Sequence, residues 1–180
     1  NGTVHVGPGT YAQNITVTKS ITLSGAGAAT TVITVTSGTA IEMLASNVTV
    51  SGFTIESTGA TYGIRNYDSA ASAWVLDITD YRISNNTITG FQHAIWLRRA
   101  NGEISSNIIH DNSRTGIRLH GFPSGTLAGP TTVSSNILYA NGSALLDHDI
   151  QIQDSYTGTL VSGNIITGSL TAGEVGIYVY

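Results

Sequence analysis

Short segments in which apolar and polar residues alternate recur along this 180-residue chain. One kind reads aliphatic-Ser-x-Asn, and two earlier, looser copies carry Ala26 and Phe53 in place of Asn. The aliphatic residues stand at positions 23, 50, 83, 104, 133 and 161, so the steps between copies are 27, 33, 21, 29 and 28 residues. Internal repeats of this length are typical of a solenoid.

A second kind of segment follows the copies and reads small-aliphatic-x-aliphatic, as at 94–97 and 116–119. Its period of two and its β-branched residues favour strands, so we expect two strands per repeat. Strands that recur with no helix between them do not form a doubly wound sheet, but they stack as coils. The sequence therefore predicts an all-β fold, a right-handed parallel β-helix of about six to seven coils. Residues 1–180 are expected to be one β-helix domain, either whole or a segment of a longer solenoid.

The asparagines of the repeat have a structural explanation. Each follows a strand and should lie at a bend, because Asn tolerates left-handed backbone geometry. Identical amides one coil apart can also form a hydrogen-bonded ladder along the axis of the solenoid. We therefore assign a structural rather than a catalytic role to Asn86, Asn107, Asn136 and Asn164.

The first strands carry a family resemblance. Residues 3–11, 14–17, 21–27 and 31–34 resemble the opening coils of pectinesterase-like and pectate-lyase-like proteins, within the pectin-lyase-like superfamily. The resemblance implies a right-handed parallel β-helix. Residues 91–98 are similar to a pectinesterase segment that contributes a glutamine, but the Asp-bearing motifs of that family have no matching positions here. No catalytic residue is therefore carried over, and methylesterase activity is not expected.

Composition excludes several functions. The net charge is −4 with a single lysine, which argues against a nucleic acid partner because phosphate binding needs many cationic contacts. A role at the membrane surface is disfavoured for the same reason, and no apolar run is long enough to insert into a membrane. The chain has no cysteine and no disulfide, and we expect a secreted or cell-surface protein. Five sequons mark possible N-glycosylation sites, at Asn1, Asn14, Asn47, Asn85 and Asn141.

Alignment of the coils predicts columns of outward-facing residues. One column reads Glu42, Arg65, Trp96, Arg118, Gln151, Tyr178, and a second, two residues on, reads Leu44, Tyr67, Arg98, His120, Gln153, Tyr180. Aromatic rings stack on sugars, whereas Arg and His bind hydroxyls or carboxylates, so this face suits a carbohydrate or a protein interface. The alternative is that the arginines only pair with nearby carboxylates. The candidate binding residues are Tyr62, Arg65, Tyr67, His93, Trp96, Arg98, Arg118 and His120.

Two functions fit this face. The first is an extracellular structural or adhesive module that contacts glycans and assembles with other copies end to end, because the chain opens and closes on strand patterns. The second is a polysaccharide-active enzyme, most simply a lyase of acidic glycans, with Arg98, Arg118 and His120 as catalytic candidates. The first reading needs no cofactor and no metal. Calcium is expected only for the lyase, as the family resemblance implies, and the columns hold no carboxylate cluster for it.

Overall fold

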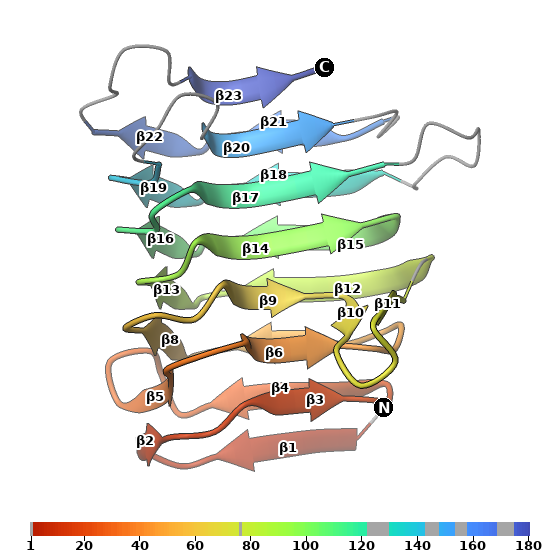
Figure 1. Cartoon of the computed structure of the whole chain (residues 1–180), viewed down its shortest axis with the longest axis vertical. Helices are drawn as coiled ribbons and strands as arrows, with labels where there is room; N and C mark the ends of the chain where they lie inside the picture. The colour runs from red at the N-terminus through yellow and green to blue at the C-terminus, as the bar shows by residue number, and fades with distance from the viewer. Residues whose placement is uncertain (1, 76, 122–129, 143–147, 154–157, 169–174) are drawn as a thin grey trace.

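The computed structural model describes residues 2–75, 77–121, 130–142, 148–153, 158–168 and 175–180. These residues contain strands and turns but no helix, and the strands form three seven-stranded parallel sheets stacked as coils (Figure 1). We call the sheets front, rear and side after their places in Figure 1. The prediction of an all-β, right-handed parallel β-helix is confirmed.

The front sheet consists of β3 (Ile15–Val17), β6 (Thr39–Met43), β9 (Tyr62–Arg65), β14 (His93–Arg98), β17 (Thr115–His120), β20 (His148–Gln153) and β23 (Val175–Val179). The rear sheet consists of β1 (Gly2–Val6), β4 (Ile21–Gly25), β7 (Thr49–Ser51), β12 (Ile78–Ser84), β15 (Ala100–Ser105), β18 (Thr131–Ser134) and β21 (Leu160–Ser162). The side sheet consists of β2 (Gly9–Tyr11), β5 (Thr31–Val35), β8 (Thr54–Ser57), β13 (Thr87–Thr89), β16 (Ile108–His110), β19 (Ile137–Tyr139) and β22 (Ile165–Thr167).

Each coil therefore has three strands, not the two expected from the sequence. The missed strands are those of the side sheet, which begin directly after the repeat asparagine and are mostly three residues long. Three residues are too few for an alternating pattern to stand out, so the strands of the side sheet were interpreted as part of the turn. The repeat itself predicted the register correctly, because the aliphatic positions 23, 50, 83, 104, 133 and 161 are paired in the rear sheet.

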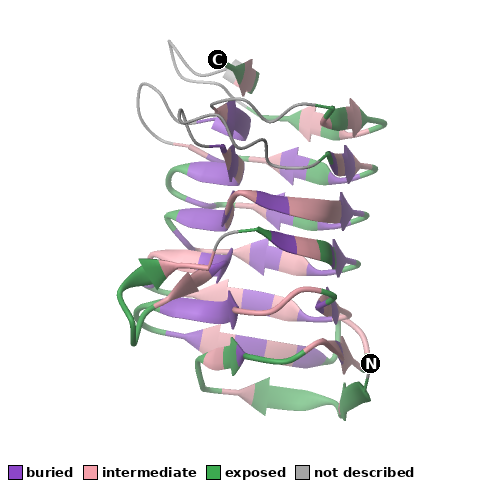
Figure 2. Ribbon diagram, turned by 90° about the vertical axis from the view of Figure 1, so that its right-hand side faces the viewer, coloured by how far each residue is buried: buried purple, intermediate pink, exposed green. Residues whose placement is uncertain are grey.

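The core is made of aliphatic columns that run along the axis. On the front sheet the inward residues Ile41, Ile64, Ile95, Ile117 and Ile150 are in register and fully buried. Burial of each such side chain contributes about 1.5–3 kcal/mol relative to exposure. Figure 2 shows that buried residues dominate the middle coils, whereas β1 is largely exposed. The best-buried part of the core therefore lies beneath the middle strands of the front sheet.

An asparagine ladder joins the coils at the turn between the rear and side sheets. The amide nitrogen of each rung donates to the amide oxygen of the next, with Nδ2–Oδ1 distances of 3.2, 3.0 and 2.9 Å. Each Nδ2 also donates to a backbone carbonyl, and each oxygen also accepts a backbone N–H from the preceding coil. The rungs are Asn86, Asn107, Asn136 and Asn164.

The left-handed bend lies one residue earlier than the sequence analysis expected. The residue before each rung has positive φ, from 56° at Asn85, Ser106 and Ser135 to 62° at Gly163, and the equivalent Gly52 has a φ of 78°. The rung asparagine is therefore placed by the bend and does not itself form it. Its function is to satisfy buried backbone groups that the turn leaves without strand partners.

A second, unpredicted ladder crosses the turn before the front sheet. Asn112 Nδ2 donates to Asn141 Oδ1 and Asn141 Nδ2 donates to Asp149 Oδ1, both over 2.8 Å. Asn141 is 3% exposed, and its Nδ2 also donates to the carbonyl of Ile109, so both of its amide N–H groups are used. Burial and this pairing argue against glycosylation of Asn141 in the folded chain. Of the other predicted sequon asparagines, Asn14, Asn47 and Asn85 are exposed, and Asn1 lies outside the described residues.

The longest repeat step contains an inserted hairpin. Strands β10 (Tyr67–Asp68) and β11 (Ala73–Trp74) pair antiparallel and project from the coil between β9 and β12 (Figures 1 and 2). The turn is held by Asp68 Oδ1, which accepts the N–H groups of Ala70 and Ala71. The hairpin extends the front sheet's outer face with side chains that no other coil supplies.

Candidate functional site

The central column on the outer face of the front sheet takes one residue from each coil, as the repeat predicted. Strand pairing places Glu42, Arg65, Trp96, Arg118, Gln151 and Tyr178 in direct register. Because parallel strands lie about 4.8 Å apart, neighbouring members of this column are within contact distance. The six positions carry five residue types, with only arginine occurring twice, in contrast to the identical asparagines of the ladder.

Aromatic rings gather around Trp96 at the centre of this face. Its ring lies 5.3 Å from Tyr62, 4.9 Å from His93 and 5.3 Å from Trp74 of the hairpin, in each case tilted. Tyr62 and His93 stack on each other with centroids 5.8 Å apart. Tilted and stacked arrangements are the favourable geometries for aromatic pairs. The rings form a wall across the sheet, and the hairpin supplies part of it.

Arginine side chains are layered between these rings. Arg65 lies between Tyr62 and Tyr67, 4.2 and 4.3 Å from their centroids. Arg118 lies 4.5 Å over Trp96, and Arg98 lies 4.9 Å over Trp74 of the hairpin. A guanidinium over an aromatic face gains cation–π attraction, and the contact holds a long side chain in one position. The arginines are therefore built into the face, not solvated above it.

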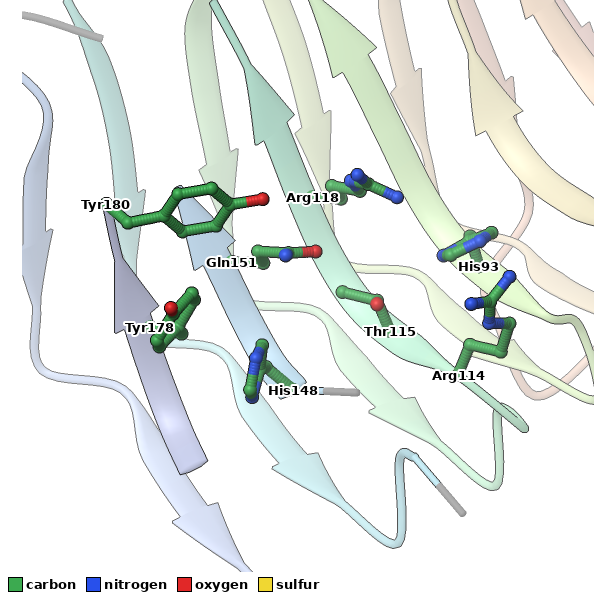
Figure 3. Close-up of a pocket in the computed structure, with 8 residues that line it drawn as sticks. All are labelled: His93, Arg114, Thr115, Arg118, His148, Gln151, Tyr178 and Tyr180. Carbon is green, nitrogen blue, oxygen red and sulfur yellow. The ribbon is translucent and has the colours of Figure 1, made fainter. Parts of the chain in front are cut away.

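A hollow of about 370 Å³ adjoins the aromatic wall on its C-terminal side (Figure 3). In Figure 3, His93 and Arg114 lie at one side of the hollow, and Tyr178 and Tyr180 lie at the other. His148 stacks on Tyr178 with centroids 4.5 Å apart, and so fixes that end. The lining residues are His93, Arg114, Thr115, Arg118, His148, Gln151, Tyr178 and Tyr180. We call this the basic hollow.

Burial and two cations keep His93 neutral. Desolvation is the largest cause, followed by the charges of Arg118 and Arg114, and together they lower the pKa of His93 from 6.5 to about 3. The ring is 3% exposed, and its Nδ1 has no hydrogen-bond partner among the described residues. Burial is also the main reason that the pKa of Arg118 is lowered, although a guanidinium remains protonated at any physiological pH.

The electrostatics of the basic hollow favour an anion. Its described lining includes Arg114 and Arg118 but no Asp or Glu. Arg118 Nη2 donates to Gln153 Oε1 over 2.9 Å, and this acceptor is neutral and does not compensate the positive charge. A carboxylate or sulfate in the hollow would meet two guanidinium groups, and charge-assisted hydrogen bonds of this type are stronger than neutral ones.

The structure separates the predicted site residues into two groups. His93 and Arg118 line the basic hollow, whereas Tyr62, Arg65, Tyr67, Trp96 and Arg98 form the aromatic and arginine wall beside it. His120 is paired with Arg98 in the next column and, like Arg98, is not among the residues of the hollow. The three lyase candidates therefore do not share one cavity.

Other arginines follow the alternative explanation. Arg82 and Glu103 form an ion pair of 2.9 Å on the rear sheet, and Arg99 pairs with Asp77 at 2.8 Å. In each pair at least one side chain is exposed, Arg82 at 57% and Asp77 at 61%. Pairing with nearby carboxylates thus accounts for these two arginines, and Arg65 on the front sheet also lies 3.6 Å from Glu42.

Several residues of the site were absent from the predicted set. Gln151, Tyr178 and Tyr180 stood on the predicted columns, so the repeat already pointed to them. Trp74 lies on the inserted hairpin, which no repeat pattern describes, and only the 33-residue step gave a hint of it. Arg114 belongs to the turn before β17 and has no counterpart in the other coils, so alignment alone was unable to identify it.

Metal and membrane roles gain no structural support. Among the described residues, no three His, Asp or Glu side chains come together in a way that would hold a metal ion. The described residues therefore offer no carboxylate cluster that fits the calcium that the lyase alternative implies. Within the same part of the chain, no helix has the length and apolar character needed to cross a membrane.

These features define a parallel β-helix with a basic, aromatic outer face. Residues 39–180 match the family model of the right-handed β-helix region. The match covers well over half of the chain, which therefore belongs to this family, and it agrees with the resemblance to the pectin-lyase-like superfamily. Comparison with curated proteins and with solved structures found no match.

Proposed function

We propose that this β-helix is a glycan-binding module that recognises acidic sugars through the front sheet. The observation that carries the proposal is the basic hollow itself. Arg114 and Arg118 share it with a neutral His93, and the described lining contains no carboxylate. A carboxylate or sulfate group of a sugar would occupy the hollow and pair with the guanidinium groups.

The aromatic wall supports a sugar ligand over other anions. The half-buried ring of Trp96 lies directly beside the hollow, because Trp96 and Arg118 are neighbours in register. Tyr180 is 53% exposed at the opposite rim. Aromatic rings on both sides of a cationic centre suit a sugar, which has apolar C–H faces and polar edges. An isolated phosphate would use only the cations.

Titration calorimetry tests this proposal. Oligosaccharides of polygalacturonate and alginate are compared with neutral oligosaccharides of similar length, at two salt concentrations. We expect the acidic ligands to bind, with weaker affinity at higher salt. Arg118→Ala should weaken binding by roughly 10- to 100-fold, the value of a hydrogen bond to a charged group.

Arg82→Ala provides the matched control, because it removes an arginine from the rear sheet. It should bind the acidic ligands like the parent chain. The proposal fails if no acidic oligosaccharide binds, or if Arg118→Ala binds as well as Arg82→Ala does.

A lyase is the second candidate, and one observation favours it. Arg118, His93 and Tyr180 line a single hollow, so a cation that neutralises a uronate carboxylate lies near two groups able to exchange protons. A pKa of about 3 makes His93 a weak base, which favours binding over catalysis. Incubation with polygalacturonate or alginate distinguishes the two, since a lyase releases unsaturated products that absorb ultraviolet light.

The wider setting stays a prediction from the sequence. Under this proposal the chain is an extracellular structural or adhesive module, secreted or held at the cell surface. End-to-end association with other copies is a further expectation of the solenoid architecture. Electron microscopy of the pure protein at rising concentration tests it, because filaments are expected and monodisperse particles would contradict it.

A further inference from the structure

A second hollow of about 390 Å³ lies at the other end of the front sheet. Its polar lining comes from the first two coils and from the hairpin loop. Glu42 and Arg118 are three register steps apart, so about 14 Å of sheet separates the two hollows, with the aromatic wall between them. The polar lining residues are Asn14, Thr16, Ser37, Thr39, Glu42 and Ser69. We call this the hydroxyl hollow.

The charge of Glu42 is compensated within the protein. Its Oε1 accepts a short hydrogen bond from Ser69 Oγ and lies 3.6 Å from Arg65 Nη2, and both charged side chains are about 10% exposed. Arg65 Nη2 also donates to Ser69 Oγ over 2.8 Å, so the three groups form one network. Glu42 is the one ionisable group in the described lining. The hydroxyl hollow is therefore close to electrically neutral, in contrast to the basic hollow.

A buried hydroxyl in this hollow lacks a partner. Thr39 is 3% exposed, and its Oγ1 makes no hydrogen bond within the described structure. Leaving a buried hydroxyl unsatisfied costs free energy, and a native structure usually does so only where water or a ligand binds. Thr39 lines the hollow together with Asn14, whose Nδ2 already donates hydrogen bonds to the carbonyls of Ser37 and Thr39. The open hydrogen-bonding positions are thus mostly acceptors and hydroxyls.

We propose that the hydroxyl hollow binds a neutral sugar unit. A sugar hydroxyl would accept from or donate to Thr39 Oγ1 and would donate to the Glu42 carboxylate, while Ile15 and Ala70 would contact its C–H face. The volume lies within the range of small-molecule sites. The inference rests on the proposed function only in taking the ligand to be a glycan. It adds that the front sheet has two binding sites of different charge preference.

Thr39→Val tests the inference, because it keeps the shape of the side chain and removes the hydroxyl. Binding of neutral oligosaccharides is followed by nuclear magnetic resonance titration, using cello-, xylo- and galacto-oligosaccharides as probes. In the parent chain, one of these ligands should shift the amide signals of Thr16, Gly38 and Thr39. Thr39→Val should bind that ligand roughly 3- to 10-fold more weakly, the value of one hydrogen bond.

Stability provides a second readout with the opposite sign. Replacing an unpaired buried hydroxyl by a methyl group removes its desolvation cost, so Thr39→Val should raise the urea midpoint of the free protein. Thr87→Val, a half-buried threonine of the side sheet, is the matched control and should leave sugar binding unchanged. A threonine with only a structural role would lose stability on substitution and would not alter binding.

Three outcomes would overturn the inference. The first is that no neutral probe shifts the amide signals, which would mean that the hollow holds only water. The second is equal binding by Thr39→Val and the parent chain. The third is a lower urea midpoint in Thr39→Val. None of them depends on Arg118 or on an acidic ligand. Failure of the proposed acidic-glycan function is therefore distinguishable from failure of this second site.

Discussion

Two columns of residues run along the same axis of this β-helix, and they differ in how far the side chain is repeated from coil to coil. At the turn between the rear and side sheets, four asparagines repeat the same residue and the same hydrogen bonds from coil to coil. On the outer face of the front sheet, six successive positions carry five residue types, and only arginine occurs twice. Both columns are in strict register, so the difference lies in the side chains and not in the backbone.

The comparison indicates where the repeat serves folding and where it serves binding. A solenoid stabilises itself through nearest-neighbour contacts, which identical residues make equally well in every coil. A ligand presents a different group at each point along its length, so a binding face needs variety. The structure is consistent with a division of roles in which the ladder fixes register and the front sheet uses that register to assemble Trp96, Arg118 and their neighbours.

Removing a central rung should have the largest effect on stability. Asn107→Ala removes the acceptor of the Asn86 backbone N–H and of Asn86 Nδ2, and the amide donor to the carbonyl of Ile83 and to Asn136 Oδ1, all in a buried turn. We expect the free energy of unfolding to fall by about 4 kcal/mol, measured by urea denaturation. Asn164→Ala, at a partly buried rung, should cost about half as much. Equal losses would contradict a cumulative ladder.

Acid should destabilise the fold through His93. The pKa of His93 is about 3 in the folded state and 6.5 in the unfolded state. Between these pH values the unfolded state binds a proton and the folded state does not. Stability from this source is complete above pH 6.5 and is lost as the pH falls toward 3. At pH 4.5 the loss is about 3 kcal/mol, from two pH units at 1.36 kcal/mol each.

The His93 contribution is isolated by a variant that keeps the aromatic ring. His93→Phe cannot take up a proton, so its stability should fall by less between pH 6.5 and 4.5 in urea titrations at each pH. An identical pH dependence in the two proteins would show that His93 is not held neutral by its surroundings.

Trp96→Ala should separate binding from folding. The half-buried ring contacts Tyr62, His93, Trp74 and Arg118, and its removal should cost about 2 kcal/mol of stability, less than for a fully buried tryptophan. Acidic-glycan affinity should fall at least about tenfold, because the ring also positions Arg118. Calorimetric titration of the folded variant checks this result. Undiminished affinity would remove the aromatic wall from the proposed site.

The smallest effect is expected at the rear sheet. Arg82 pairs with Glu103 at an exposed position, and such pairs contribute about 0–1 kcal/mol. Arg82→Ala should therefore change the urea midpoint little, and the change should shrink further in high salt. A loss as large as that of Asn107→Ala would mean that the charged surface, and not the ladder, holds the coils together.

Most of the fold was predictable because the spacing of the sequence repeat determines which residues pair between neighbouring coils. The sequence alone is enough to assign the aliphatic positions and the outward column from Glu42 to Tyr178, since each coil copies the last. The side sheet was not predicted because its strands, mostly three residues long, are too short to show an alternating pattern. The bend was predicted one residue late because Asn tolerates positive φ better than most residue types. The residues that have positive φ are Asn85, Ser106 and Ser135, each directly before a rung.

The candidate site was less predictable for a related reason. Trp74 and Arg114 lie on an insertion and in a turn, where no neighbouring coil provides a comparison. The neutral state of His93 follows from burial between rings and arginines of three coils, which no linear pattern reveals. The unpaired hydroxyl of Thr39 depends on the packing around β6, which the sequence pattern does not reveal.

Hydroxyl-radical footprinting with an acidic oligosaccharide tests the central claim most directly, because it compares aromatic side chains on different sheets in one experiment. The account predicts that ligand protects Trp96, Tyr178 and Tyr180 of the front face from oxidation. Tyr11 and Tyr139 of the side sheet should react equally with and without ligand. Protection of the side-sheet tyrosines, or equal oxidation of Trp96 and Tyr180 in both states, would contradict a binding face on the front sheet.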